Sequence, residues 1–178
     1  MDRRTLIRHA KSCGLLLIPA FAWNLALFDL LPPAFSKASF GQGIPAYLTT
    51  VENVARAVLF TLPFFMPLEL ATPVQRRGLA LFTAGTLVYF ASWLALIIWP
   101  SSVWSTSAAG FMAPAYTPLL WLSGLALVGR RLFWGHAYRW WYYLLIAALF
   151  LTAHIWHTAI VHARGLPASA FYGDPLVK

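Results

Sequence analysis

Charged residues are scarce in this chain: Asp, Glu, Lys and Arg together make up 10% of its 178 residues. A soluble domain typically carries about 25% charged residues, so this composition excludes an ordinary soluble domain. The basic residues stand in short clusters between apolar runs, an arrangement that orients membrane spans and meets lipid headgroups. We therefore predict that the lipid bilayer is the main partner and that nucleic acid is not bound, despite the net charge of +8.

Cysteine is nearly absent as well, because Cys13 is the only one. A single cysteine excludes an intrachain disulfide and a thiolate metal cluster. The chain also lacks a P-loop, a glycine-rich dinucleotide motif, a G-x-S-x-G elbow and an H-E-x-x-H motif. Histidine lies inside only one apolar segment, which disfavours a haem held by two histidines of one subunit. The sequence therefore leaves the cofactor unknown.

Long apolar runs dominate what remains. Five segments stand out, at residues 13–31, 54–72, 78–99, 108–129 and 140–163. About twenty apolar residues suffice for a helix to cross a bilayer, and uninterrupted runs favour helices over barrel strands. The first segment continues past a cleavage-site look-alike, so we expect an uncleaved span. The sequence predicts one all-α integral membrane domain over residues 1–178, a bundle of five transmembrane helices.

The distribution of basic residues predicts the orientation of this bundle. With a cytoplasmic N-terminus, the inner side holds nine of the 13 basic residues, namely Arg3, Arg4, Arg8, Lys11, Arg76, Arg77, Arg130, Arg131 and Arg139. The positive-inside rule then predicts that the N-terminus lies inside and the C-terminus outside. The expected location is the cytoplasmic (inner) membrane of a bacterial-type cell.

The fifth segment carries the histidines. On a helix, residues three or four positions apart share a face, so His154, His157 and Thr158 form one polar stripe in its outer half. An ionisable side chain at that depth is costly and by default marks a site. Histidine can also relay protons near neutral pH or ligate a metal.

Polar residues of other spans can face this stripe. Asp29 and Asn24 lie in the outer half of the first span, and Tyr89 lies in the third. We expect His154 to point into the bundle, toward the first or third helix, with one of these three as its hydrogen-bond partner. Glu52 and Arg56 are also at this level, but their i, i+4 spacing favours a local pair. The predicted ligand-binding residues are His154, His157, Asp29, Asn24 and Tyr89.

Three functions remain open on these grounds. The first is the binding or transport of a small or lipid-like ligand in an outer-half cavity lined by the fifth helix. The proline pairs at 63 and 67 and at 114 and 118 would break two helices and form its movable wall. The second is a membrane-embedded metal-dependent hydrolase or transferase that uses His154, His157 and Asp29 as metal ligands. The third is a structural subunit without a site. The oligomeric state is open.

The predicted orientation can be tested by cysteine labelling. A membrane-impermeant maleimide added to intact cells should modify a cysteine placed at Ser169 and miss one placed at Gln75. The reason is that the basic cluster around Arg76 should hold its segment on the cytoplasmic side. The parent chain, which carries only Cys13, is the control, and the reverse labelling pattern contradicts the orientation.

Overall fold

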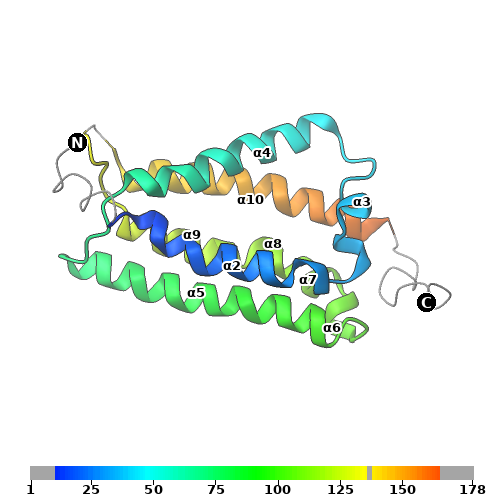
Figure 1. Cartoon of the computed structure of the whole chain (residues 1–178). Coiled ribbons are helices and arrows are strands. Elements are labelled where there is room, and N and C mark those ends of the chain that lie inside the picture. Colours follow the sequence, from blue (N-terminus) through cyan, green and yellow to red (C-terminus); the bar gives the residue numbers. More distant parts are fainter. Residues whose placement is uncertain (1–10, 136–137, 165–178) are drawn as a thin grey trace.

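The computed structural model describes residues 11–135 and 138–164 of the chain. Every regular element in these ranges is helical, and one isolated bridge joins Ser12 to Pro67. The helices run along a common direction and form an elongated bundle (Figure 1). The predicted all-α fold is therefore confirmed. The chain ends, on which the predicted positions of the termini and of Ser169 depend, lie outside the described residues.

Three helical segments are long and apolar enough to cross a membrane. They are Cys13–Leu30, α5 at Pro73–Ile98 and α10 at Trp140–Ala163. The first is composite: the 3-10 helix η1 (Cys13–Leu17), the α-helix α2 (Ile18–Leu27) and the 3-10 helix η2 (Phe28–Leu30). The bounds of α10 match the predicted fifth span. These segments are compatible with a membrane protein, as the composition predicts.

The second predicted span, 54–72, is displaced in the structure. Helix α4 spans Ala46–Thr61, and the 3-10 helix η4 continues it over Leu62–Phe65. Pro63 and Pro67 explain the early end, because neither has an N–H to donate to the helix. Pro45 is the N-cap residue, so the polar positions after it, including Glu52, belong to the helix. Helix α4 is not one of the three segments that are long and apolar enough to cross a membrane.

The fourth predicted span, 108–129, is broken into short helices. They are α7 (Ala108–Phe111), α8 (Ala113–Tyr116) and α9 (Pro118–Val128), and the short helix α6 (Val103–Thr106) precedes them. Pro114 and Pro118 lie in the first turns of α8 and α9, where a missing N–H is tolerated. The predicted proline break is thus present here, and Ala113–Val128 is an apolar stretch shorter than a typical span.

Helix α5 begins earlier than the predicted third span, 78–99. Thr72 caps it: its side chain accepts from the Gln75 backbone, and the Gln75 side chain accepts from the Thr72 backbone. This reciprocal arrangement is a capping box, which stabilises a helix start. The Gln75 side chain also donates to the Val128 carbonyl at 3.3 Å and so connects the ends of α5 and α9.

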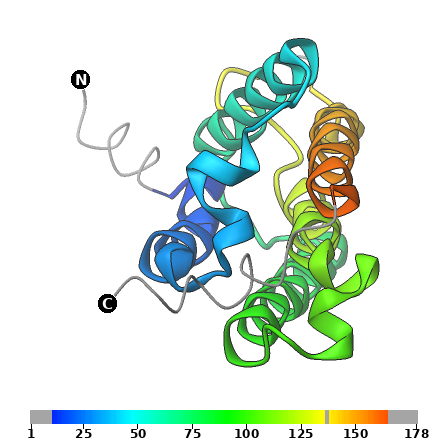
Figure 2. The same cartoon turned by 90° about the vertical axis from the view of Figure 1, so that its right-hand side faces the viewer.

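Glycines allow α5 and α9 to pack closely along their length. A Cβ atom at Gly85 would lie 2.5 Å from the backbone nitrogen of Trp121, and one at Gly124 would lie 2.3 Å from that of Phe82. Such contacts leave no room for a side chain, so these backbones approach as small-residue interfaces in membranes do. The end-on view shows α4 beside α10 on the side opposite α5, with α2 on a third side (Figure 2).

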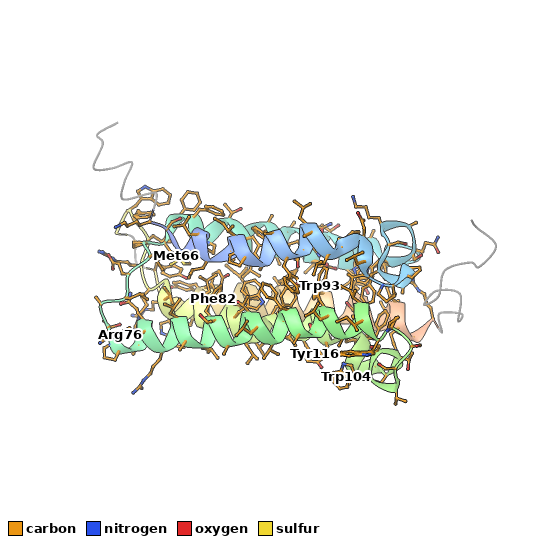
Figure 3. The ribbon with its side chains drawn as sticks, turned by 60° about the horizontal axis from the view of Figure 1, so that its bottom comes forward. Met66, Arg76, Phe82, Trp93, Trp104 and Tyr116 are labelled. Carbon is orange, nitrogen blue, oxygen red and sulfur yellow. The ribbon has the colours of Figure 1, made fainter. Side chains whose placement is uncertain are left out.

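The two ends of the bundle differ in chemistry. At one end, which we call the basic end, Arg131 pairs with Glu69, Leu68 donates to the Lys11 carbonyl, and Phe133 donates to the Phe65 carbonyl. The hydrogen bond to Glu69 and the charge of that carboxylate raise the pKa of Arg131. Figure 3 places Arg76 at this end and Trp104 at the other, with Phe82 and Trp93 between them.

The tryptophans of the described residues include an exposed group and a buried group. Those at the helix ends are exposed, namely Trp99, Trp104, Trp134, Trp140 and Trp141. Trp93 and Trp121, which lie deeper, are buried in the core cluster. Exposed tryptophan at both ends of apolar helices is the pattern of an aromatic belt at a membrane interface.

The contact between α5 and α9 can be tested by overpacking. Gly85→Val should destabilise the protein by at least about 1–3 kcal/mol, because the new side chain meets backbone that cannot move aside. Unfolding of the detergent-solubilised protein, followed by circular dichroism, measures this. Ala84→Val adds the same side chain at a neighbouring exposed position of α5 and should change stability little. Equal effects of the two substitutions would contradict the packing.

Candidate functional site

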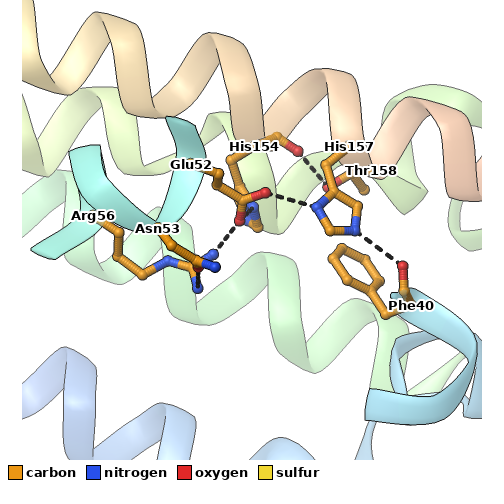
Figure 4. Close-up of polar contacts among 7 residues, drawn as sticks. All are labelled: Phe40, Glu52, Asn53, Arg56, His154, His157 and Thr158. Atoms are coloured by element: carbon orange, nitrogen blue, oxygen red, sulfur yellow. Dashed lines mark hydrogen bonds and ion pairs between the residues drawn. The ribbon is translucent and has the colours of Figure 1, made fainter. Parts of the chain in front are cut away.

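A buried carboxylate joins α4 to α10. Glu52 projects from α4 and is only 2% exposed. Its two oxygens accept hydrogen bonds from two histidines of α10: Oε1 lies 3.0 Å from Nδ1 of His154, and Oε2 lies 2.7 Å from Nδ1 of His157 (Figure 4). Arg56, one turn further along α4, donates to Oε1 as well. The carboxylate is therefore bound on both oxygens by groups from two helices.

His157 is bonded through both ring nitrogens. Its Nε2 lies 3.0 Å from the carbonyl oxygen of Phe40, which belongs to the short helix α3 (Lys37–Phe40). The Phe40 ring also stacks on the imidazole, with 4.4 Å between the ring centroids. A carbonyl oxygen only accepts hydrogen bonds, so Nε2 carries a hydrogen. His157 thereby fastens the segment before α4 onto α10.

The spacing of the sequence creates this geometry. His154 and His157 are three positions apart on α10, so both rings lie on the face that packs against α4. Thr158 extends this face, and its hydroxyl donates to the His154 carbonyl at 2.8 Å. Glu52 and Arg56 are four positions apart and lie on one face of α4. Two polar stripes therefore meet inside an apolar bundle.

A cavity of about 460 Å³ lies beside this cluster. Its walls are mainly aromatic, from Phe21, Phe28, Phe35, Phe40, Phe60, Phe111, Phe150, Trp93 and Trp121. Its polar lining comes from Asn24, Arg56, Tyr89, His154 and Thr158. A mostly apolar cavity of this size with a few convergent polar groups is typical of a small-molecule site.

His154 stands between the cluster and the cavity. Its Nδ1 is bonded to Glu52, and its ring stacks on Phe150 with 5.4 Å between centroids. No other described residue forms a hydrogen bond with its Nε2, and the side chain is 23% exposed. The guanidinium of Arg56 lies 5.5 Å from the Phe150 ring centroid, in cation–π range. Arg56 and His154 thus form a charged and polar part of the lining, contributed by α4 and α10.

The structure places the five predicted ligand-binding residues in three groups. His154 and His157 meet at Glu52, although only His154 lines the cavity. Asn24 and Tyr89 also line it and bond to each other, with the Tyr89 hydroxyl 2.6 Å from the Asn24 side-chain oxygen. Asp29 lies in η2, is exposed, and makes no hydrogen bond or ion pair with another described residue.

The predicted partner of His154 was wrong in one respect. The ring lies within the bundle, but it bonds to Glu52 on the second helical segment, not to a residue of the first or third. Asn24 and Tyr89 satisfy each other across α2 and α5, which removes both as partners. The local pair of Glu52 with Arg56 is present as the sequence predicts, yet it leaves the carboxylate free to accept from the histidines as well.

The histidines do not gather the predicted metal ligands. Asp29 does not join His154 and His157, and among residues 11–135 and 138–164 no group of three or more His, Cys, Asp or Glu side chains is placed to hold a metal ion. In the pairing seen here, Nδ1 of both imidazoles is directed at a carboxylate oxygen. The arrangement suits proton sharing and anchoring.

Several contributors to the site were not among the predicted ligand-binding residues, namely Phe40, Glu52, Arg56 and Thr158. Glu52 is one of only 5 acidic residues in the chain, and this scarcity was the signal that could have identified it. Phe40 contributes a backbone carbonyl, which no side-chain pattern reveals.

No protein-family model, curated protein or solved structure matches the chain.

Removing the carboxylate tests its anchoring role. Glu52→Ala should lower the free energy of unfolding by about 3–5 kcal/mol, because Arg56 and the two imidazoles lose their common buried partner. Chemical unfolding in detergent, followed by circular dichroism, gives this value. Glu69→Ala, which removes the exposed carboxylate at the basic end, is the matched control and should have a much smaller effect. A small loss for Glu52→Ala would contradict the anchor.

Proposed function

We propose that the chain is a five-span protein of a cytoplasmic membrane, with its basic end inside and its α3 end outside. The support is the clustering of basic residues. At this end the Lys11 carbonyl accepts from Leu68, and Arg131 pairs with Glu69. The start of α5, which carries Arg76 and Arg77, is bonded to the end of α9 through Gln75 and Val128. Helix α4 and the Ala113–Val128 stretch are the two remaining spans in this proposal, because each runs alongside α10 or α5 (Figure 1).

We infer that the protein binds a small or lipid-like apolar molecule in the cavity at its outer half. The carrying observation is the cavity itself, which has aromatic walls, a volume of about 460 Å³, and a polar patch formed by Arg56 and His154 with Thr158. Apolar surface provides the affinity for such a ligand, and a few fixed polar groups orient it. The Glu52 cluster keeps these polar groups in position.

Transport would require one wall of this cavity to move. Pro114, Ala115 and Pro118 line the cavity at the break between α8 and α9. Broken helices at the middle of a bundle are where transporters place their sites, because the break supplies a hinge. In this proposal the α8–α9 break is the movable wall, while α4 and α10, joined through Glu52, form the fixed one.

Binding can be tested by filling the cavity. Ala20 is a buried residue of its lining, so Ala20→Phe should place a bulky ring in the cavity and obstruct the ligand. In phosphatidylcholine nanodiscs, ω-bromoundecanol and ω-bromoundecanoic acid should each quench tryptophan fluorescence with a saturable component. The reason is that bromine would contact Trp93 and Trp121.

The filled variant should lose this saturable component and keep the linear one that arises from probe dissolved in the bilayer. Ala22→Phe, which places the same side chain at an exposed position of α2, is the control and should quench as the parent does. Absence of saturable quenching by both probes in the parent chain would leave a structural role for the cluster and contradict the binding proposal.

A further inference from the structure

The hydrogen bonds of the Glu52 cluster determine its charge. A proton must lie between His157 Nδ1 and Glu52 Oε2, because neither atom can bond the other without one. The Phe40 carbonyl requires a second proton on Nε2 of the same ring. If the shared proton sits on the histidine, His157 is +1 and Glu52 is −1; if it sits on the carboxyl, both are neutral. The pair carries no net charge either way.

The remaining members of the cluster add positive charge. His154 donates from Nδ1 to Glu52 Oε1 in its neutral form, with the lone pair on Nε2. Arg56 is always protonated. The cluster of Glu52, Arg56, His154 and His157 therefore carries a net charge of at least +1, and a proton on Nε2 of His154 would raise it further.

Nothing in the described part of the chain balances this charge. Its acidic side chains are Asp29, Glu52 and Glu69. Glu52 is already counted, Glu69 pairs with Arg131 at the basic end, and Asp29 is exposed outside the lining. A charge beside an apolar cavity is costly unless a partner of opposite sign approaches it. The two groups that reach the cavity from the cluster, Arg56 and His154, are those that would meet such a partner.

From this charge excess we propose that the ligand, in the binding function proposed above, is an apolar monocarboxylic acid. Its carboxylate would lie against Arg56 and His154, and its apolar body would lie among the aromatic walls. Two of the guanidinium nitrogens already donate, to Glu52 and Asn53, and the group still has further N–H donors. A monoanion matches the net +1, whereas a phosphate monoester carries about −1.5 to −2.

The test compares head groups on one apolar chain. In phosphatidylcholine nanodiscs, ω-bromoundecanoic acid should show saturable quenching at a concentration at least about tenfold lower than ω-bromoundecanol, since a hydrogen bond to a charged group adds that much. It should also bind more tightly than ω-bromoundecyl phosphate. Equal binding of the acid and the alcohol would overturn the acid proposal and leave the binding function standing. Tighter binding of the phosphate would overturn the choice of a carboxylate.

Substitutions of the cation complete the test. Arg56→Gln should abolish the preference for the acid over the alcohol, and Arg56→Lys should retain part of it, because the charge is kept. Arg131→Gln at the basic end is the control and should leave the preference unchanged. Nanodiscs that contain phosphatidylglycerol test the remaining source of an anion. If this lipid displaces the acid, the occupant is a membrane headgroup and the proposal is overturned; if the acid still binds, the proposal stands.

Discussion

The attachment of one buried carboxylate to two imidazoles determines the geometry of this molecule's polar centre. Glu52 fixes α4 to α10 through His154 and His157, and His157 extends the connection to α3 through the Phe40 carbonyl. Each bond lies where water has little access, so an unmade bond would be costly. This network also holds part of the cavity wall in place, because Phe40 from α3, Arg56 from α4 and His154 from α10 all line the cavity.

The sequence was sufficient to predict the features that depend on interactions between residues close together in the chain. Apolar length predicts α10 to the residue, and prolines predict the break near Pro114 and Pro118. It was less successful with α4, which begins at Ala46 because polar residues remain helical after Pro45. Periodicity also places His154 and His157 on one face. The sequence does not show which helix packs against that face.

The site shows the consequence of that missing information. When the order of helices around the bundle is unknown, the sequence favours Asp29 over Glu52 as the acidic partner of the histidine stripe, because Glu52 has Arg56 as a local partner. The observed packing of α4 on α10 selects Glu52, and the contact of Asn24 with Tyr89 uses up the two neutral candidates. The i, i+4 spacing of Glu52 and Arg56 predicts a real pair, yet a carboxylate has room for several donors. A local pair therefore does not exclude a role in a larger cluster.

The shared proton between Glu52 and His157 is the centre of the account, since it sets both the anchor and the charge of the cavity wall. Solid-state NMR of the protein in lipid bilayers, with ¹³C-labelled Glu and ¹⁵N-labelled His, measures it directly. We expect a dipolar contact between the side-chain carboxyl carbon of Glu52 and Nδ1 of His157, together with hydrogen-bonded shifts at both nitrogens of that ring. The contact should vanish in Glu52→Gln labelled the same way. A His157 ring without this contact, or with an unbonded nitrogen, would contradict the account.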